Sequence, residues 1–123
     1  MPTGKIAIEG MKIFAHHGYY QEEQVLGKEY IVDVYLEFDF LETLQSDQIS
    51  DTINYEQVME ICLEEMNHPS KLLEQVAIRM ANRIRQLSQK EMEIKVRIQK
   101  PNPRLKVQVD KFYVEYEIRG DLS

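Results

Sequence analysis

The sequence predicts an α+β fold in which two helices cover one face of a four-stranded antiparallel sheet. Four segments alternate apolar and polar residues with a period of two, the pattern of strands that are buried on one face only. Two segments between the second and third of these carry an apolar stripe with helical spacing. The predicted order is β-β-α-α-β-β, and strands with one apolar and one polar face are typical of antiparallel sheets.

The first two strands lie near the N-terminus. Alternating apolar residues predict a strand over residues 5–15, and the alternation slips by one position at Gly10, as a β-bulge would cause. Residues 30–40 alternate more strictly and predict the second strand. The connection between them, HHGYYQEEQVLGKE, contains Gly18 and Gly27, and its polar centre indicates a loop or an irregular hairpin connection.

Two amphipathic helices follow. An apolar stripe over residues 55–66 predicts the first, and Asn54 is placed to cap its N-terminus. A second stripe over residues 72–87 predicts the other helix, with Ser70 or Asn67 as its N-cap.

The last two strands complete the sheet. Residues 91–99 return to a period of two, and residues 112–118 form a final strand. The sheet face away from the helices then carries Asp33, Glu37, Asp39, Glu93, Lys95 and Arg97. We expect this mixed-charge face either to meet water or to line a wet cavity that is formed with other subunits.

Composition limits the classes of function. The 123 residues fit a single domain, taken as residues 1–123. The net charge is −6, with no Lys/Arg cluster longer than a pair, so nucleic acid is not an expected partner. No apolar stretch is long enough for a membrane helix. The chain has one cysteine, Cys62, and no secretory signal pattern at its N-terminus, so we expect a protein of the reducing cytoplasm.

Lys100 is the first candidate functional residue, in the segment VRIQKPNPRL. By strand parity it falls in line with Ile94 and Ile98, so its side chain should leave on the helix-covered face. A lysine held there, close to a rigid exit formed by Pro101 and Pro103, can act as a base. The alternative is a lysine that only extends past the strand end to water.

Three further side chains are candidates, each with an ordinary structural alternative. Glu74 lies in the first turn of the second helix, where acids are favoured in any case, but its two oxygens could bind an N–H pair of a flat heterocycle. Tyr55 begins the first helix, where a tyrosine is commonly a core or interface residue. Glu22 lies in the glycine-bounded loop and, taken alone, would be a solvated carboxylate.

The histidines do not predict a metal site. His16 and His17 are adjacent, so on a strand they would point to opposite faces. His68 has no second ligand three or four residues away. We expect neither a metal nor a cofactor.

Four segments together resemble the dihydroneopterin aldolase family. They are HGYYQEEQVLGKEYIVDVYL, DTINYEQV, LLEQVAIRMANRI and KVRIQKPNP, and with their spacing they span nearly the whole chain up to Pro103. The resemblance implies the tunnelling fold, in which four subunits join their sheets into a ring-shaped barrel and two rings commonly stack into an octamer. The active sites then lie at subunit interfaces, and the polar sheet face would line the tunnel.

The resemblance also implies a reaction and roles for residues. The reaction is the metal-free and cofactor-free retro-aldol cleavage of 7,8-dihydroneopterin, a pterin, into 6-hydroxymethyl-7,8-dihydropterin and glycolaldehyde, with general acid–base catalysis. Lys100 matches the acid and base that works through bound water, and Tyr55 matches a residue that assists proton transfer. Glu22 matches the loop carboxylate that helps to hold the lysine and the water.

The remaining matches concern substrate binding. Glu74 matches the anchor of the pterin 2-amino and ring N–H groups, with the backbone of Leu73 beside it. Thr52 and Ile53 match a segment that lines the site from a neighbouring subunit. The sequence departs from the family pattern after Pro103, where RLKVQVDKFYVEYEI has bulky side chains before the last strand.

Three alternatives stay open. An epimerase acting on dihydroneopterin triphosphate shares this fold and much of the site, and Lys71, Arg104 and Lys106 are the loose candidates for binding its phosphates. A non-catalytic binding module could keep the ring without the chemistry. A zinc-dependent pterin synthase has the same fold, and metal analysis would identify it.

Overall fold

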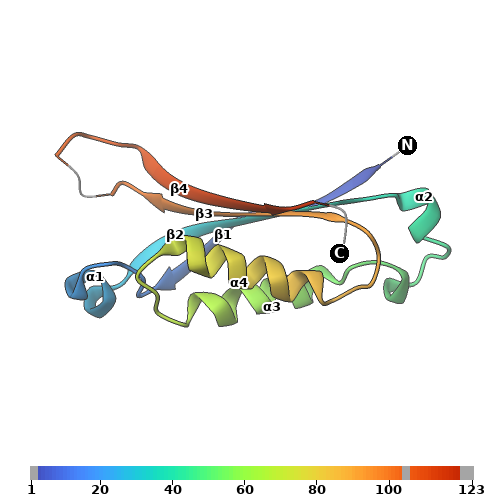
Figure 1. Cartoon of the computed structure of the whole chain (residues 1–123), viewed down its shortest axis with the longest axis horizontal. Helices are drawn as coiled ribbons and strands as arrows, with labels where there is room; N and C mark the ends of the chain where they lie inside the picture. The colour runs from blue at the N-terminus through green and yellow to red at the C-terminus, as the bar shows by residue number, and fades with distance from the viewer. Residues whose placement is uncertain (1–2, 104–105, 120–123) are drawn as a thin grey trace.

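The computed structural model describes residues 3–103 and 106–119, in which one antiparallel sheet packs against a layer of helices (Figure 1). The strands are β1 (Gly4–Ala15), β2 (Lys28–Phe38), β3 (Glu93–Pro101) and β4 (Lys111–Ile118), and the two long helices are α3 (Tyr55–Met66) and α4 (Leu73–Arg85). The order across the sheet is β1-β2-β3-β4, with every neighbouring pair antiparallel. The predicted fold class is confirmed.

The predicted bulge in β1 is present. The pairing of β1 with β2 shifts its register between Ile8 and Met11, and Gly10 between them adopts a φ of 77°. This left-handed conformation is open to glycine at little steric cost. The Gly10 amide donates to Asp33 Oδ1 at 2.7 Å, so the bulge is fixed to the neighbouring strand.

The helices begin differently from each other. Asn54 caps α3 as predicted, its Oδ1 accepting the Glu56 amide at 2.9 Å. The N-cap prediction for α4 is wrong, because Leu72 occupies that position and makes no side-chain cap. The two predicted caps, Ser70 and Asn67, both lie before the start of the helix. The Ser70 amide instead donates to His17 Nδ1.

Three short elements were not predicted: α1 (Gln21–Leu26), α2 (Phe40–Thr43) and η1 (Ile49–Asp51). Each is too short to show a helical period in the sequence. The predicted loop between the first two strands therefore contains a helix, α1. Strand β2 ends two residues earlier than predicted, because Asp39 accepts the Leu41 and Glu42 amides and so caps α2.

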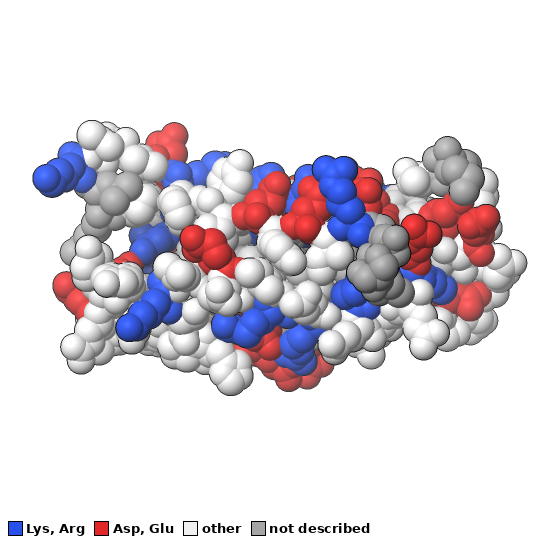
Figure 2. All heavy atoms as spheres, in the orientation of Figure 1, with Lys and Arg blue, Asp and Glu red and all other residues white. Residues whose placement is uncertain are grey.

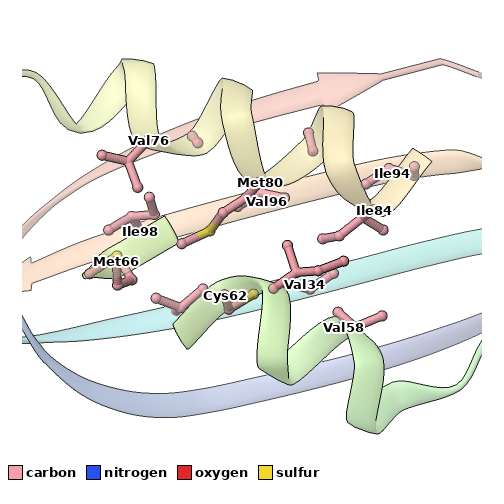
Figure 3. Packing of buried hydrophobic residues seen from close by; sticks show 14 of the residues in the cluster. Val34, Val58, Cys62, Met66, Val76, Met80, Ile84, Ile94, Val96 and Ile98 are labelled. Carbon is pink, nitrogen blue, oxygen red and sulfur yellow. The ribbon is translucent and has the colours of Figure 1, made fainter. Parts of the chain in front are cut away.

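The core lies between the sheet and the two long helices. Its most deeply buried members include Val32, Val34, Val58, Cys62, Met66, Val76, Met80, Ile84, Ile94, Val96 and Ile98. Figure 3 shows Met80 of α4 lying over Val96 of β3, and Cys62 of α3 beside Val34 of β2. Because full burial of each such side chain contributes about 1.5–3 kcal/mol, this core holds the two long helices against the sheet.

The opposite face of the sheet is polar, as predicted. Lys5 pairs with Glu37 at 3.3 Å and Arg97 with Glu115 at 2.8 Å. Figure 2 shows acidic and basic side chains interspersed along the sheet edge in this view. A hollow of about 240 Å³ lies among them. Within the described residues, no helix combines the length and apolar character needed to cross a bilayer.

The two ends of the molecule carry different segments. Helix α1, the end of β3, the start of β4 and the start of α4 lie at one end (Figure 1). Helix α2, η1 and the start of α3 lie at the other end (Figure 1). This separation decides which candidate residues a single chain can bring together.

Candidate active site

Lys100 lies at the end of β3, where strand parity predicts it. Ile94, Val96 and Ile98 are fully buried on the helix side, and Lys100 follows them in phase with its side chain 21% exposed. Its Nζ donates to Glu23 Oε2 across the gap between β3 and α1. The lysine therefore ends in a partly enclosed ion pair rather than in open solvent.

Helix α1 supplies the carboxylate of this pair. Glu23 Oε1 also accepts the Tyr20 amide at 3.3 Å, so the side chain is held from both sides. The hydrogen bond from Lys100 is the main cause that lowers the pKa of Glu23 below its ordinary value of 4.5. The carboxylate is thus ionised near neutral pH.

The contact with Lys100 differs from the expectation for Glu22. Glu22 lines the same cavity, but the carboxylate hydrogen-bonded to Lys100 belongs to Glu23. Successive side chains of a helix point about 100° apart, so the two neighbours cannot share one direction. No sequence signal separates the two acids, because a tyrosine at the N-cap does not give the Ser/Thr-x-x-Glu pattern of a capping box.

His17 is a second residue that the sequence did not single out for this site. It is 1% exposed, and its Nδ1 accepts the Ser70 amide at 3.1 Å. Burial, and next the nearby Arg79, lower the pKa of His17 to about 4, so the ring is neutral near pH 7. Its carbonyl accepts the Tyr30 hydroxyl at 3.0 Å. His17 thereby joins the end of β1 to the connection before α4.

A cavity of about 600 Å³ opens around the ion pair. It is lined by His17, Tyr20, Glu22, Glu23, Leu26, Gly27, Lys28, Tyr30, Lys100 and Pro103. This volume is within the range of small-molecule sites in proteins. In the part of the chain that the structure describes, no group of three or more His, Cys, Asp or Glu side chains could hold a metal ion.

Leu73 and Glu74 lie at the same end of the molecule as this cavity. The Gly18 amide donates to the Ser70 carbonyl at 2.9 Å, which fixes the start of α4 close to His17. Glu74 is in the first turn of α4, as predicted, and is exposed. Among the described residues, however, neither Leu73 nor Glu74 lines the Lys100 cavity.

Thr52, Ile53 and Tyr55 lie elsewhere. Helix α3 starts at Tyr55, and its last residue, Met66, is the one whose carbonyl faces His17. Eleven helical steps of 1.5 Å separate the two ends by about 16 Å. Ile53 is buried in the core, whereas Tyr55 is 57% exposed. Within one chain, these residues are not brought to the Lys100 cavity.

The segments that carry this site match a known family. A family model described as FolB, dihydroneopterin aldolase, matches residues 6–117. The chain belongs to the dihydroneopterin aldolase family. The family indicated by the sequence is therefore confirmed.

Curated members of the dihydroneopterin aldolase family are similar over most of their length. The dihydroneopterin aldolase of Bacillus subtilis is 33% identical over 100 residues, covering 80% of this chain and 83% of that protein. The dihydroneopterin aldolase of Staphylococcus epidermidis is 36% identical over 99 residues, covering 80% and 82%. The crystal structure of the E. coli dihydroneopterin aldolase in complex with neopterin has a TM-score of 0.74 at 19% identity, covering 92% of this chain and 98% of that one. That likeness supports the fold.

Proposed function

We propose that this chain is a dihydroneopterin aldolase that cleaves 7,8-dihydroneopterin into 6-hydroxymethyl-7,8-dihydropterin and glycolaldehyde. The observation that carries the proposal is the Lys100–Glu23 ion pair at the wall of a cavity of about 600 Å³. Family membership and a related structure that holds neopterin support the choice of substrate. The buried free thiol of Cys62 fits a reducing cytoplasm as the location.

Acid–base chemistry at Lys100 accounts for the cleavage. A base removes the proton from the hydroxyl on the second side-chain carbon, and the bond between the first and second carbons breaks to release glycolaldehyde. The bond electrons move into the ring, where N5 accepts a proton. The enol-like intermediate is then protonated on the first carbon and N5 gives up its proton. Lys100, with bound water, handles these protons, and Glu23 holds its ammonium group in place.

The start of α4 supplies ring recognition in this proposal. The Glu74 carboxylate is exposed and offers two oxygens to the 2-amino group and the neighbouring ring N–H, a paired contact that fixes the plane of the ring. The backbone of Leu73 lies beside it. The hydrogen bonds that join Ser70 to His17 and Gly18 tie the segment before α4 to the end of β1, and His17 lines the Lys100 cavity.

A second copy of the chain completes the site. Tyr55 and Thr52 are needed at the cavity, yet they lie about one helix length away in their own chain. Exposed apolar side chains at Tyr55, Met59 and Leu63 form a stripe on α3 that a neighbouring subunit could cover. Both β1 and β4 are open sheet edges, which can pair between copies. We therefore propose a ring of four subunits, stacked in pairs into an octamer, with the polar sheet face lining the tunnel.

A product assay tests the proposed function. The protein is incubated separately with 7,8-dihydroneopterin and with its triphosphate, with and without a chelator, and glycolaldehyde is followed. We expect release from the unphosphorylated compound at a rate that the chelator does not change. Conversion of the triphosphate alone would identify the epimerase, and loss of activity with the chelator would identify a zinc enzyme. Arg104, one candidate for phosphate binding, lies outside the described residues.

A further inference from the structure

Lys90 fixes a part of the chain that is far from it in sequence. It lies in the connection between α4 and β3, at the end of the molecule opposite the Lys100 cavity. Its Nζ donates to the Asp51 carbonyl and, at 3.4 Å, to the Thr43 carbonyl. Thr43 ends α2 and Asp51 ends η1. One ammonium group therefore holds both ends of the segment 43–51.

Arg85 in turn fixes the backbone that carries Lys90. It is 8% exposed in the last turn of α4, and its Nη1 donates to the carbonyls of Ser88 at 3.3 Å and Lys90 at 2.9 Å. Neither Arg85 nor Lys90 takes part in an ion pair with another described residue. Because both cations bind carbonyl oxygens, they orient the backbone directly through charge-assisted hydrogen bonds.

The segment that these cations hold leads straight to Tyr55. Ser46 Oγ donates to Asp51 Oδ2 at 2.6 Å, and the Thr52 amide donates to the Ile49 carbonyl at 3.2 Å. Ile53 then enters the core at 6% exposure. Asp51 to Tyr55 is thus fixed at its start by Lys90 and at its centre by burial, while the Tyr55 ring is presented outward at 57% exposure.

We propose that Lys90 is a positioning residue for the active site of a neighbouring subunit. By holding the Asp51 carbonyl, it sets where Thr52 and Tyr55 enter the neighbour's cavity. This inference rests on the proposed function, in which both residues act across the subunit interface. Since a misplacement of about 1 Å can cost about a hundredfold in rate, we expect Lys90→Met to lower kcat/KM by about tenfold to a hundredfold. The loss should fall on kcat more than on KM, because Tyr55 assists proton transfer.

Single variants test the local part of the inference. Lys90→Arg keeps a cation that can reach carbonyl oxygens and should retain most of the activity. Gln89→Met is the matched control, since Gln89 is exposed in the same connection and should leave activity unchanged. Equal losses in Gln89→Met and Lys90→Met, or no rescue by arginine, would overturn the proposal. If Lys90→Met does not assemble, Lys90→Gln replaces it in every comparison.

Mixed rings test whether Lys90 acts across the interface. Two chains with different tags, one Lys100→Ala and one Lys90→Met, are produced together, and rings that carry both tags are purified. A cavity with an intact Lys100 can then be completed by residues 51–55 of a neighbouring chain in which Lys90 is intact. If the two chains are arranged at random in the ring, about a quarter of the sites combine an intact Lys100 with a neighbour that has an intact Lys90. We therefore expect about a quarter of wild-type activity, which is more than either variant has alone.

A parallel mixture separates this inference from the proposed function. Lys100→Ala is combined with Tyr55→Phe in the same way, which tests only whether the site is shared between subunits. A gain in that mixture without a gain in the Lys90→Met mixture contradicts the role of Lys90 and leaves the shared site intact. No gain in either mixture removes the shared site, and the inference with it.

Discussion

The buried base His17 should make the stability of this fold depend on pH. In the unfolded chain its pKa is the ordinary 6.5, whereas burial and the nearby Arg79 lower the pKa of His17 to about 4 in the fold. Between these values the unfolded chain binds a proton that the native protein does not. The stability contributed by neutral His17 is therefore complete above about pH 6.5 and is lost as the pH falls to about 4.

The size of the effect follows from the two pKa values. They differ by about 2.5, and a tenfold change in a dissociation constant corresponds to about 1.4 kcal/mol. The contribution of His17 to the free energy of unfolding should therefore fall by about 2 kcal/mol between pH 7.5 and pH 5, and by about 3 kcal/mol between pH 7.5 and pH 4.

Urea unfolding of wild type and His17→Asn measures this contribution. Asparagine can still accept the Ser70 amide but does not titrate, so its stability lacks the His17 component. Carboxylates such as Glu23 titrate in both proteins and cancel in the comparison. At equal protein concentration, the stability gap between the two proteins should narrow by about 2 kcal/mol from pH 7.5 to pH 5. Parallel curves over this range would refute the reasoning.

Other features give further predictions. Glu23→Gln should lower kcat by at least about tenfold, because Glu23 contacts Lys100, whereas Glu22→Gln should have a smaller effect; equal losses in steady-state assays would contradict this. Burial raises the pKa of the Cys62 thiol to about 12, so a thiol reagent at pH 8 should react at least about a hundredfold more slowly with native than with urea-unfolded protein. Gly27→Ala should destabilise the fold by about 1–3 kcal/mol in denaturant titrations, because φ is 74° there and a Cβ would lie 2.5 Å from an aromatic ring; unchanged stability would argue against this strain.

The fold and the position of Lys100 could be predicted because both follow from the spacing of apolar residues along the sequence. Alternation fixes which face a strand residue occupies, and Lys100 needed only that parity and a strand end. The carboxylate that contacts Lys100 could not be predicted in this way. Glu22 and Glu23 are neighbours in a helix of six residues, too short to show a period, so only the backbone geometry of α1 distinguishes them.

Contacts between segments that are far apart in the chain could not be predicted from the sequence either. His17 looked like one of two adjacent histidines, and its role depends on the Ser70 amide 53 residues away. No sequence pattern singles out Lys90, because the Thr43 and Asp51 carbonyls at its Nζ lie 47 and 39 residues away in the chain. The sequence could place Tyr55 on a helix, but only the structure shows that this helix carries it away from Lys100.

Turnover by Lys100→Met tests the central claim most directly. Methionine keeps the length and packing of the side chain but cannot carry protons, and binding of the pterin product serves as the control for an intact site. We expect release of glycolaldehyde from 7,8-dihydroneopterin to fall by about a hundredfold to ten-thousandfold while the product still binds. Wild-type turnover by Lys100→Met would contradict the assignment of the acid and base to this residue.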